Sequence, residues 1–175
     1  MLIDLNELFK KDNYNMELDL EVTLDEFSSR AGTFTIKDKT PLHLKLFHNK
    51  DKQFSVEGQC TLTIVIPCDR CLEDVENKFD ISFSKEFDLE REESSKENES
   101  EEVKFITDDN KLLVDAILNE ELLLIWPGKV LCKEDCKGLC HVCGHNLNVS
   151  DCGCDRVVLD PRMAAIQDIF KNSGN

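Results

Sequence analysis

The sequence predicts an α+β fold, in which a mainly antiparallel β domain is covered by one helix and followed by a C-terminal Cys-rich module and a short terminal helix. Apolar and polar residues alternate through much of residues 1–91. A single long segment with helical periodicity follows at 108–127, and six of the nine cysteines lie between Cys132 and Cys154. A period of two is typical of strands with one buried face, and a period near 3.6 is typical of a helix.

The strands are predicted within residues 1–91. Alternation is present at 16–24 and 42–46, and it is clearest in FSVEGQCTLTIVI at 54–66. A second alternating segment at 75–89 follows after a short connection. Two such strands joined by a short connection are expected to form a long antiparallel hairpin, whose tip is the sequence PCDRC.

The acidic segment between the hairpin and the helix is predicted to be solvated. Residues 92–102, EESSKENESEE, contain six Glu and no apolar residue. Such a run cannot contribute to a core, so residues 92–107 are predicted as a linker or loop.

Two helices are predicted after this linker. The covering helix at 108–127 has Asp or Asn available as N-cap and stops at Pro127-Gly128. Trp126 is expected in the core at its end rather than as a base-stacking platform. Residues 128–175 are predicted to hold the Cys-rich module and a short terminal helix, with Asp160 as N-cap and Pro161 at its first position.

The charge balance restricts the possible partners. Asp and Glu outnumber Lys and Arg by 36 to 21, which gives a formal net charge of -15. Such a surface opposes broad contact with a phosphate backbone and favours basic partners. The first residues lack a basic start followed by a long apolar run, and no stretch approaches the ~20 apolar residues of a membrane span. We therefore expect a cytoplasmic protein without membrane contact.

The cysteines indicate metal rather than disulfides. Thiols stay reduced in the cytoplasm, and the nine cysteines would leave one unpaired. Four converging thiolates form a structural zinc site, and Cys-x-x-Cys in a tight turn presents two sulfurs on the same side of the backbone. Two such pairs are present, Cys68 with Cys71 and Cys140 with Cys143. The second is followed by Gly144, where positive φ lets backbone amides point at sulfur.

Four further cysteines bring the candidate ligands to eight, enough for one or two structural zinc ions in a zinc-knuckle module. In one partition, the hairpin-tip pair joins Cys132 and Cys136, and the pair in GLCHVCG joins Cys152 and Cys154. The spacing also allows Cys132 and Cys136 to join the pair in GLCHVCG, and this alternative stays open. The candidate ligands are Cys68, Cys71, Cys132, Cys136, Cys140, Cys143, Cys152 and Cys154.

The remaining candidates receive structural roles. Cys60 falls on the apolar face of its strand, where a small buried hydrophobe is the usual role. His141 and His145 could replace a sulfur ligand, but enough cysteines exist without them, so both are expected to be exposed polar residues of the knuckle.

No feature of the sequence predicts an enzyme. A site saturated by four thiolates has no open position for a catalytic water, which favours structural zinc. The sequence contains no phosphate-binding glycine loop, Ser-His-Asp order or His-Glu-x-x-His motif. Neither Cys-x-x-Cys pair has the βαβ setting of a thioredoxin-type site. We therefore expect no small-molecule substrate.

A family resemblance rests on motifs that follow in order: PCDRCL at 67–72, VDAILNEELLLIWP at 114–127 and LCKEDCKGLCHVCGHNLN at 131–148, with CGC and DPRMAAI behind them. Over residues 55–170 the chain closely resembles the bacterial YceD family, from which it departs by its long acidic insert. That family is associated with accumulation of large-subunit ribosomal RNA and is not a known enzyme. The positions that match its motifs are Cys68, Arg70, Cys71, Leu72, Cys136, Gly138, Leu139, Cys140, Cys143, Gly144, Asn146, Leu147 and Asn148.

The resemblance implies a non-enzymatic ribosome-biogenesis factor that supports accumulation or processing of large-subunit ribosomal RNA. Its zinc module would bind a ribosomal protein or a large-subunit ribosomal RNA precursor. Five basic and five acidic residues balance between residues 129 and 162. Each zinc centre with four thiolates adds about two negative charges, so a basic ribosomal protein is the favoured direct partner. The candidate contact residues are Arg70, Lys133, Lys137, Arg156 and Arg162.

The alternative function is a zinc-thiolate redox switch or adaptor protein. Oxidation of the thiolates would eject the metal and loosen the module. This function requires exposed thiolates of low pKa.

Overall fold

The computed structural model describes residues 1–10, 14–48, 53–88, 105–107 and 109–155. The chain divides into two compact units. The larger unit comprises Met1–Pro67 and Asp74–Val130, and the smaller unit comprises Cys68–Glu73 with the chain from Leu131 onward. The tip of the central hairpin therefore belongs to the same unit as the C-terminal cysteines.

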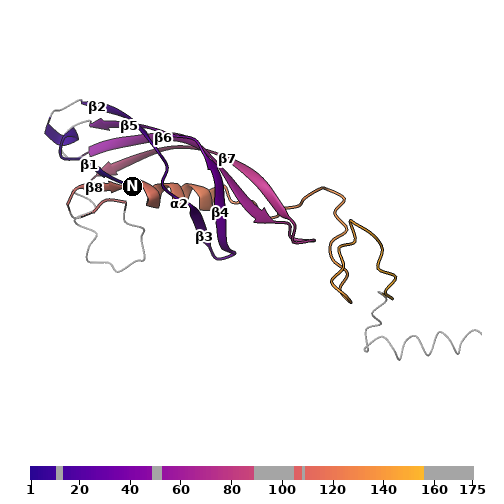
Figure 1. Ribbon diagram of the computed structural model, residues 1–175. Helices are drawn as coiled ribbons and strands as arrows, with labels where there is room; N and C mark the ends of the chain where they lie inside the picture. The colour runs from indigo at the N-terminus through magenta and orange to yellow at the C-terminus, as the bar shows by residue number, and fades with distance from the viewer. Residues whose placement is uncertain (11–13, 49–52, 89–104, 108, 156–175) are drawn as a thin grey trace, which may run out of the picture. The chain divides into compact units, whose positions relative to one another are not determined.

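The described part of the larger unit consists of antiparallel sheets and one α-helix, which confirms the predicted fold class (Figure 1). Six strands form one sheet in the order β2-β5-β6-β4-β3, with β7 paired to β6, and β1 pairs with β8 separately. The elements are β1 Leu2–Asp4, the 3-10 helix η1 Leu8–Lys10, β2 Asn15–Leu20, β3 Glu26–Ser29, β4 Gly32–Lys39, β5 Leu42–His48, β6 Gln53–Pro67, β7 Asp74–Asp88, β8 Lys111–Leu113 and α2 Val114–Leu124.

Strands β6 and β7 form the long hairpin that the alternating pattern predicts. Their register is continuous from Gln53↔Asp88 to Pro67↔Asp74. The apolar side chains of both strands share one buried face, because successive side chains in a strand point to opposite faces. Cys60 is buried on this face, as predicted, and burial raises the pKa of its thiol to about 11.

Helix α2 buries one face in the larger unit. Its buried side chains are Val114, Ile117, Leu118 and Leu122. The helix begins later than the predicted range 108–127, because residues 111–113 pair with β1 as strand β8. The predicted Asp or Asn N-cap is also wrong: Leu113 occupies the N-cap and makes no side-chain cap hydrogen bond.

Trp126 packs among aromatic rings in the larger unit, which confirms its predicted core position. Its ring stacks on Phe79 of β7 at 5.6 Å between centroids and lies 4.8 Å from Phe27 and 4.9 Å from Phe34. Phe27 and Phe34 come from β3 and β4, which the alternation pattern did not reveal.

Two predicted segments fall wholly or largely outside the described residues. The acidic linker at 92–107 is described only at its end, where Ile106 forms a bridge with Leu112. The terminal helix beginning at Asp160 lies outside the described residues. Among the helices that are described, none combines the length and apolar character needed to cross a bilayer.

A side chain added at Gly58 is predicted to destabilise the larger unit. A Cβ at this position in β6 would lie 2.2 Å from the Phe83 ring of β7. Gly58→Ala is therefore expected to lower the free energy of unfolding by about 1–3 kcal/mol through overpacking. Gly128→Ala is the matched control, because an added Cβ there meets nothing within 4 Å. Denaturant unfolding of both variants would measure this, and equal stabilities would contradict the expectation.

Candidate metal centres

The eight cysteines outside the core form two groups of four. Cys68, Cys71, Cys132 and Cys136 make up site 1, and Cys140, Cys143, Cys152 and Cys154 make up site 2. Within each group all four sulfurs lie within 4.8 Å of one another, and every one of these cysteines is a free thiol. Both groups lie in the smaller unit. This is the first of the two partitions that the sequence left open.

The hairpin tip supplies two sulfurs of site 1 through a tight turn. The backbone N–H of Cys68 donates to the Glu73 carbonyl at 2.8 Å, and the Leu72 N–H donates to the Cys68 carbonyl at 2.9 Å. Leu72 adopts φ 62°, a left-handed conformation that non-glycine residues rarely take. The turn holds Cys68 and Cys71 in buried positions, with Cys68 at 0% exposure.

The sulfur spacing in site 1 suits zinc. The Cys68 and Cys136 sulfurs are 3.8 Å apart, and the Cys71 and Cys132 sulfurs are 3.5 Å apart. Both separations are far longer than a disulfide bond of about 2.05 Å. Four sulfurs placed about 2.3 Å from a tetrahedral zinc ion would be separated by about 3.8 Å. The donor set therefore fits a tetrahedral ion bound by thiolates alone.

Polar groups of the smaller unit support site 1 from outside its sulfurs. The Asn148 side-chain amide donates to the Cys136 sulfur at 3.3 Å. The guanidinium of Arg70 donates to the Cys136 carbonyl at 2.7 Å, and the Arg70 carbonyl accepts from Leu139 N–H at 3.0 Å. Hydrogen bonds of this kind orient ligands and favour the charged thiolate. Sequence spacing did not predict the bond from Asn148.

Site 2 is built on a second tight turn. The Cys140 N–H donates to the His145 carbonyl, and the Gly144 N–H donates to the Cys140 carbonyl, both at 2.8 Å. Gly144 has φ +73°, which agrees with the positive φ predicted after this Cys-x-x-Cys pair. Cys140 is buried, whereas Cys143 is exposed. Site 2 is therefore more open to solvent than site 1.

At least one thiol in each group has a lowered pKa. Burial alone would raise the pKa of Cys68, but backbone N–H groups of Arg70, Cys132 and Cys71 lower that pKa to about 6. Backbone N–H groups of Cys143 and Val142 lower the pKa of Cys140 to about 6. Amide dipoles aimed at sulfur stabilise thiolate, the form that binds metal.

Other thiols in each group are held basic. The neighbouring thiols of Cys143 and Cys152, together with burial, raise the pKa of Cys154 to about 12. A backbone hydrogen bond from Glu73 lowers the pKa of Cys71, but burial and the adjacent thiols raise it overall to about 12. Four adjacent thiols therefore resist full deprotonation until a bound cation compensates the negative charge of the thiolates.

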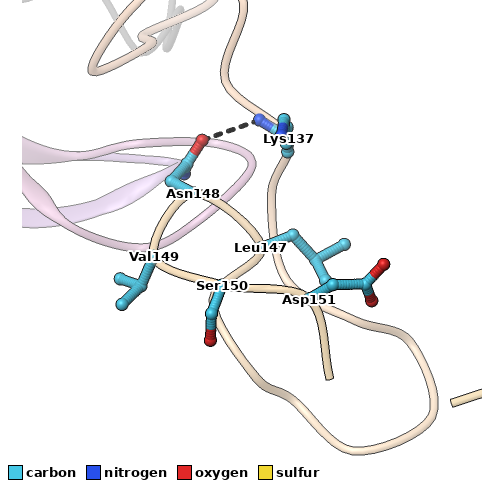
Figure 2. Close-up of a pocket in the computed structure, with 6 residues that line it drawn as sticks. All are labelled: Lys137, Leu147, Asn148, Val149, Ser150 and Asp151. Carbon is cyan, nitrogen blue, oxygen red and sulfur yellow. Dashed lines mark hydrogen bonds between the residues drawn. The ribbon is translucent and has the colours of Figure 1, made fainter. Parts of the chain in front are cut away.

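Hydrogen bonds that involve residues 146–148 connect the chain segments that carry the two groups of cysteines. The Lys137 N–H donates to the Asn148 side-chain carbonyl at 2.9 Å, and the Leu147 N–H donates to the Gly138 carbonyl at 2.9 Å. Figure 2 shows the first of these bonds at the edge of a pocket of about 300 Å³. The Asn146 side-chain amide donates to the Glu73 carboxylate at 2.9 Å. The bonds to Lys137 and Gly138 fix the chain between Cys136 and Cys140.

Gly138 lies close to the backbone of the hairpin tip. Its φ is +75°, and a Cβ there would lie 2.9 Å from the Arg70 carbonyl oxygen. Gly138→Ala is therefore expected to weaken metal retention by about 1–3 kcal/mol more than Gly144→Ala does. Gly144 has the same backbone strain at φ +73° but meets nothing within 4 Å. Zinc competition with a chromogenic chelator would measure the difference, and equal losses would rule out the close approach as its cause.

The structure also places the other residues singled out in the sequence. His141 is exposed, and the His145 ring nitrogen hydrogen-bonds the Ser150 hydroxyl at 2.8 Å, so neither ring belongs to a sulfur group. Lys133 and Lys137 are exposed. Arg156 and Arg162 lie outside the described residues.

Comparison with known proteins agrees with the motif pattern. A family model described as "Large ribosomal RNA subunit accumulation protein YceD" matches residues 56–170. The chain belongs to the YceD family. The match begins within β6 and includes the hairpin tip, α2 and all eight cysteines of the two sites.

A relative that aligns with most of this YceD-family chain is also found. A protein of Bacillus subtilis (strain 168), named "Uncharacterized protein YlbN", is 27% identical over 167 residues, which cover 94% of this chain and 94% of the relative. No solved structure matches the chain. Support for its biological role therefore comes from the description of the YceD family.

Proposed function

We propose that the chain is a non-enzymatic ribosome-biogenesis factor that supports accumulation or processing of large-subunit ribosomal RNA in the cytoplasm. The family description supports the biological process. The two groups of four thiols support a zinc-stabilised smaller unit as the binding part. A ribosomal protein or a large-subunit ribosomal RNA precursor is its partner.

Zinc has a structural role in this proposal. When bound, the ion joins four thiolates that come from distant parts of the chain and compensates part of their charge. Four protein ligands leave no open position for a substrate or a catalytic water. The residues that would hold zinc are the eight cysteines of sites 1 and 2, and their spacing and acidic thiols support this assignment.

Charge favours a protein as the direct partner over bare RNA. The chain carries a formal net charge of -15, and two zinc-thiolate centres would add about four negative charges to the protein with neutral thiols. Basic ribosomal proteins complement such a surface. Arg70 is already engaged by the Cys136 carbonyl, so the exposed Lys133 and Lys137 are the better described candidates for contact. Arg156 and Arg162 complete the proposed set.

Co-sedimentation tests the proposed function. The chain is expected to migrate with large-subunit precursors in a sucrose gradient, and its deletion is expected to lower large-subunit ribosomal RNA. Lys133→Ala/Lys137→Ala should weaken the association, whereas Lys10→Ala, an exposed lysine of the larger unit, should not. Normal ribosomal RNA after deletion, together with no co-sedimentation, would refute the proposal.

A zinc-thiolate redox switch is the second candidate, and the exposure of Cys143 favours it. Peroxide would oxidise paired thiolates to disulfides and release zinc, with peroxide reduced to water. Reversible zinc release by mild peroxide, lost in Cys143→Ser, would support the switch. Zinc that stays bound under the same treatment would exclude it.

A further inference from the structure

The outer edge of β7 is a long surface of the larger unit with no partner among the described strands. β7 pairs with β6 over its whole length, Asp74–Asp88, and no other described strand pairs with it (Figure 1). A strand with one unpaired side presents a row of N–H and C=O groups that can accept another strand. We name this side of β7 the β7 edge.

The hydrogen bonds of β6 identify which β7 residues present these groups. Thr61 is opposite Asp80, and both backbone groups of Thr61 bind Thr40 on the other side of β6. Thr61 therefore does not bond Asp80, and the backbone of Asp80 points outward. Bonded and non-bonded pairs alternate in an antiparallel ladder, so Lys78, Asp80, Ser82 and Ser84 all direct their N–H and C=O groups to the β7 edge.

The side chains on the β7 edge are acidic. The residues with outward backbone groups also place their side chains on the solvent face, because both directions alternate with the same period. Five of these eight residues are acidic and one is a lysine: Asp74, Glu76, Lys78, Asp80, Ser82, Ser84, Glu86 and Asp88. Lys37 contacts Glu76, and Lys78 lies 3.5 Å from Asp80, but both pairs are exposed and therefore weak.

The acidic charge of the β7 edge determines which kind of strand can be added to it. A second copy of β7 would place acidic residues opposite acidic residues, and like charges directly opposite one another destabilise strand pairing. A segment that carries Lys or Arg at alternate positions would instead place cations beside the acidic side chains. The β7 edge therefore discriminates against self-association and favours a basic strand.

Apolar side chains are exposed at the C-terminal end of α2, between two contacts of this segment with β7. Glu120 and Glu121 of α2 bind Lys85 of β7 at 2.6 and 2.9 Å, and Trp126 stacks on Phe79 of the same strand. The residues between these anchors, Leu123, Leu124 and Ile125, are 52%, 72% and 44% exposed. An added strand would project its inward side chains onto the face of the sheet where α2 lies.

We infer that the β7 edge binds an extended, basic segment of a partner protein as an additional strand. Main-chain hydrogen bonds to Lys78–Ser84 would provide affinity, cations on the outer face would provide selectivity, and apolar residues on the inner face would pack beside the end of α2. The inference rests on the proposed function for its biological setting and names a protein segment as the ligand of this surface.

Amide exchange on the intact zinc-loaded chain tests the inference directly. The probe is a short peptide that alternates lysine with valine. The amides of Lys78, Asp80, Ser82 and Ser84 are expected to exchange fast in the free protein and to become protected when the peptide is added. Slow exchange of these amides in the free protein would show that the edge is already paired, and it would overturn the inference.

Ser82→Pro and Ser82→Ala form the matched pair of variants. Proline removes an outward N–H that makes no bond to β6, whereas alanine keeps it. Ser82→Pro is expected to weaken peptide binding at least about tenfold, because it removes one edge hydrogen bond and blocks its neighbours, and Ser82→Ala should leave binding unchanged. If Ser82→Pro does not fold, the exchange experiment on the unaltered chain decides the matter alone.

Three further outcomes would overturn the inference: equal binding of a glutamate-valine peptide, equal binding by Ser82→Pro, and protection of the same amides by single-stranded RNA. Co-sedimentation with large-subunit precursors is measured separately. If the peptide fails while co-sedimentation persists, the β7 edge is excluded and the proposed function stands. If co-sedimentation fails while the basic peptide binds, the edge is retained and the ribosomal setting is excluded.

Discussion

Chelation of zinc is expected to unfold the smaller unit while the larger unit stays folded. The described hydrophobic core lies entirely within Met1–Pro67 and Asp74–Val130, so the smaller unit contributes no residue to it. The apparent binding free energy of a structural zinc ion is on the order of 10 kcal/mol, comparable to the whole stability of a domain. Without zinc, two groups of four crowded thiols and a few hydrogen bonds are left to order the smaller unit.

Hydrogen exchange before and after chelation would measure this. Protection across residues 132–154 should be lost, whereas amides of β6 within the sheet should keep theirs and serve as the internal control. Restored protection on adding zinc back would attribute the change to the metal. Unchanged protection across 132–154 after complete zinc removal would refute the expectation.

Replacing the hairpin-tip pair is expected to halve the zinc content. Cys68→Ser/Cys71→Ser removes two of four ligands from site 1 and none from site 2, so zinc should fall from two ions per chain to one. Cys152→Ser/Cys154→Ser should have the same effect through site 2. The readout is zinc per chain on protein purified without added metal.

Cys60→Ala is the control for these variants. Cys60 is buried in the core of the larger unit, and its substitution should leave two zinc ions per chain. A single zinc ion in both the unaltered chain and Cys68→Ser/Cys71→Ser would confine the metal to site 2. The PCDRC pair would then be two free thiols.

The central fold follows from a pattern that is local in sequence. Both strands of the β6–β7 hairpin alternate apolar and polar residues, and a short turn connects them. The pairing of the strands, their buried face and the position of the tip therefore follow from neighbouring residues. Strands β3 and β4 lack this regularity: of their residues only Phe27, Phe34 and Ile36 are buried. Strand β8 is missed because its three residues pair with β1, more than a hundred positions away.

The candidate metal sites likewise combine features that the local sequence predicts with features that depend on tertiary structure. The Cys-x-x-Cys pairs can be recognised from their spacing in the sequence, and so can the glycine after the second pair. Which cysteines join the hairpin-tip pair is a question of tertiary structure, because Cys68 and Cys136 are 68 positions apart. The contribution of Asn148 is equally hidden, since it depends on a turn that brings residue 148 back to residue 136.

Membership of Cys68–Glu73 in the smaller unit has a consequence for biosynthesis. The ribosome synthesises the hairpin tip long before Cys132 and Cys136. During translation, the two sulfurs of the tip therefore exist for a time without the other two ligands of site 1. The nascent sheet can form around β6 and β7 in that interval, but site 1 can close only when Cys136 has left the exit tunnel. Zinc loading of site 1 therefore reports that translation has passed this point, and a C-terminal fragment that begins after Cys71 cannot reproduce the site.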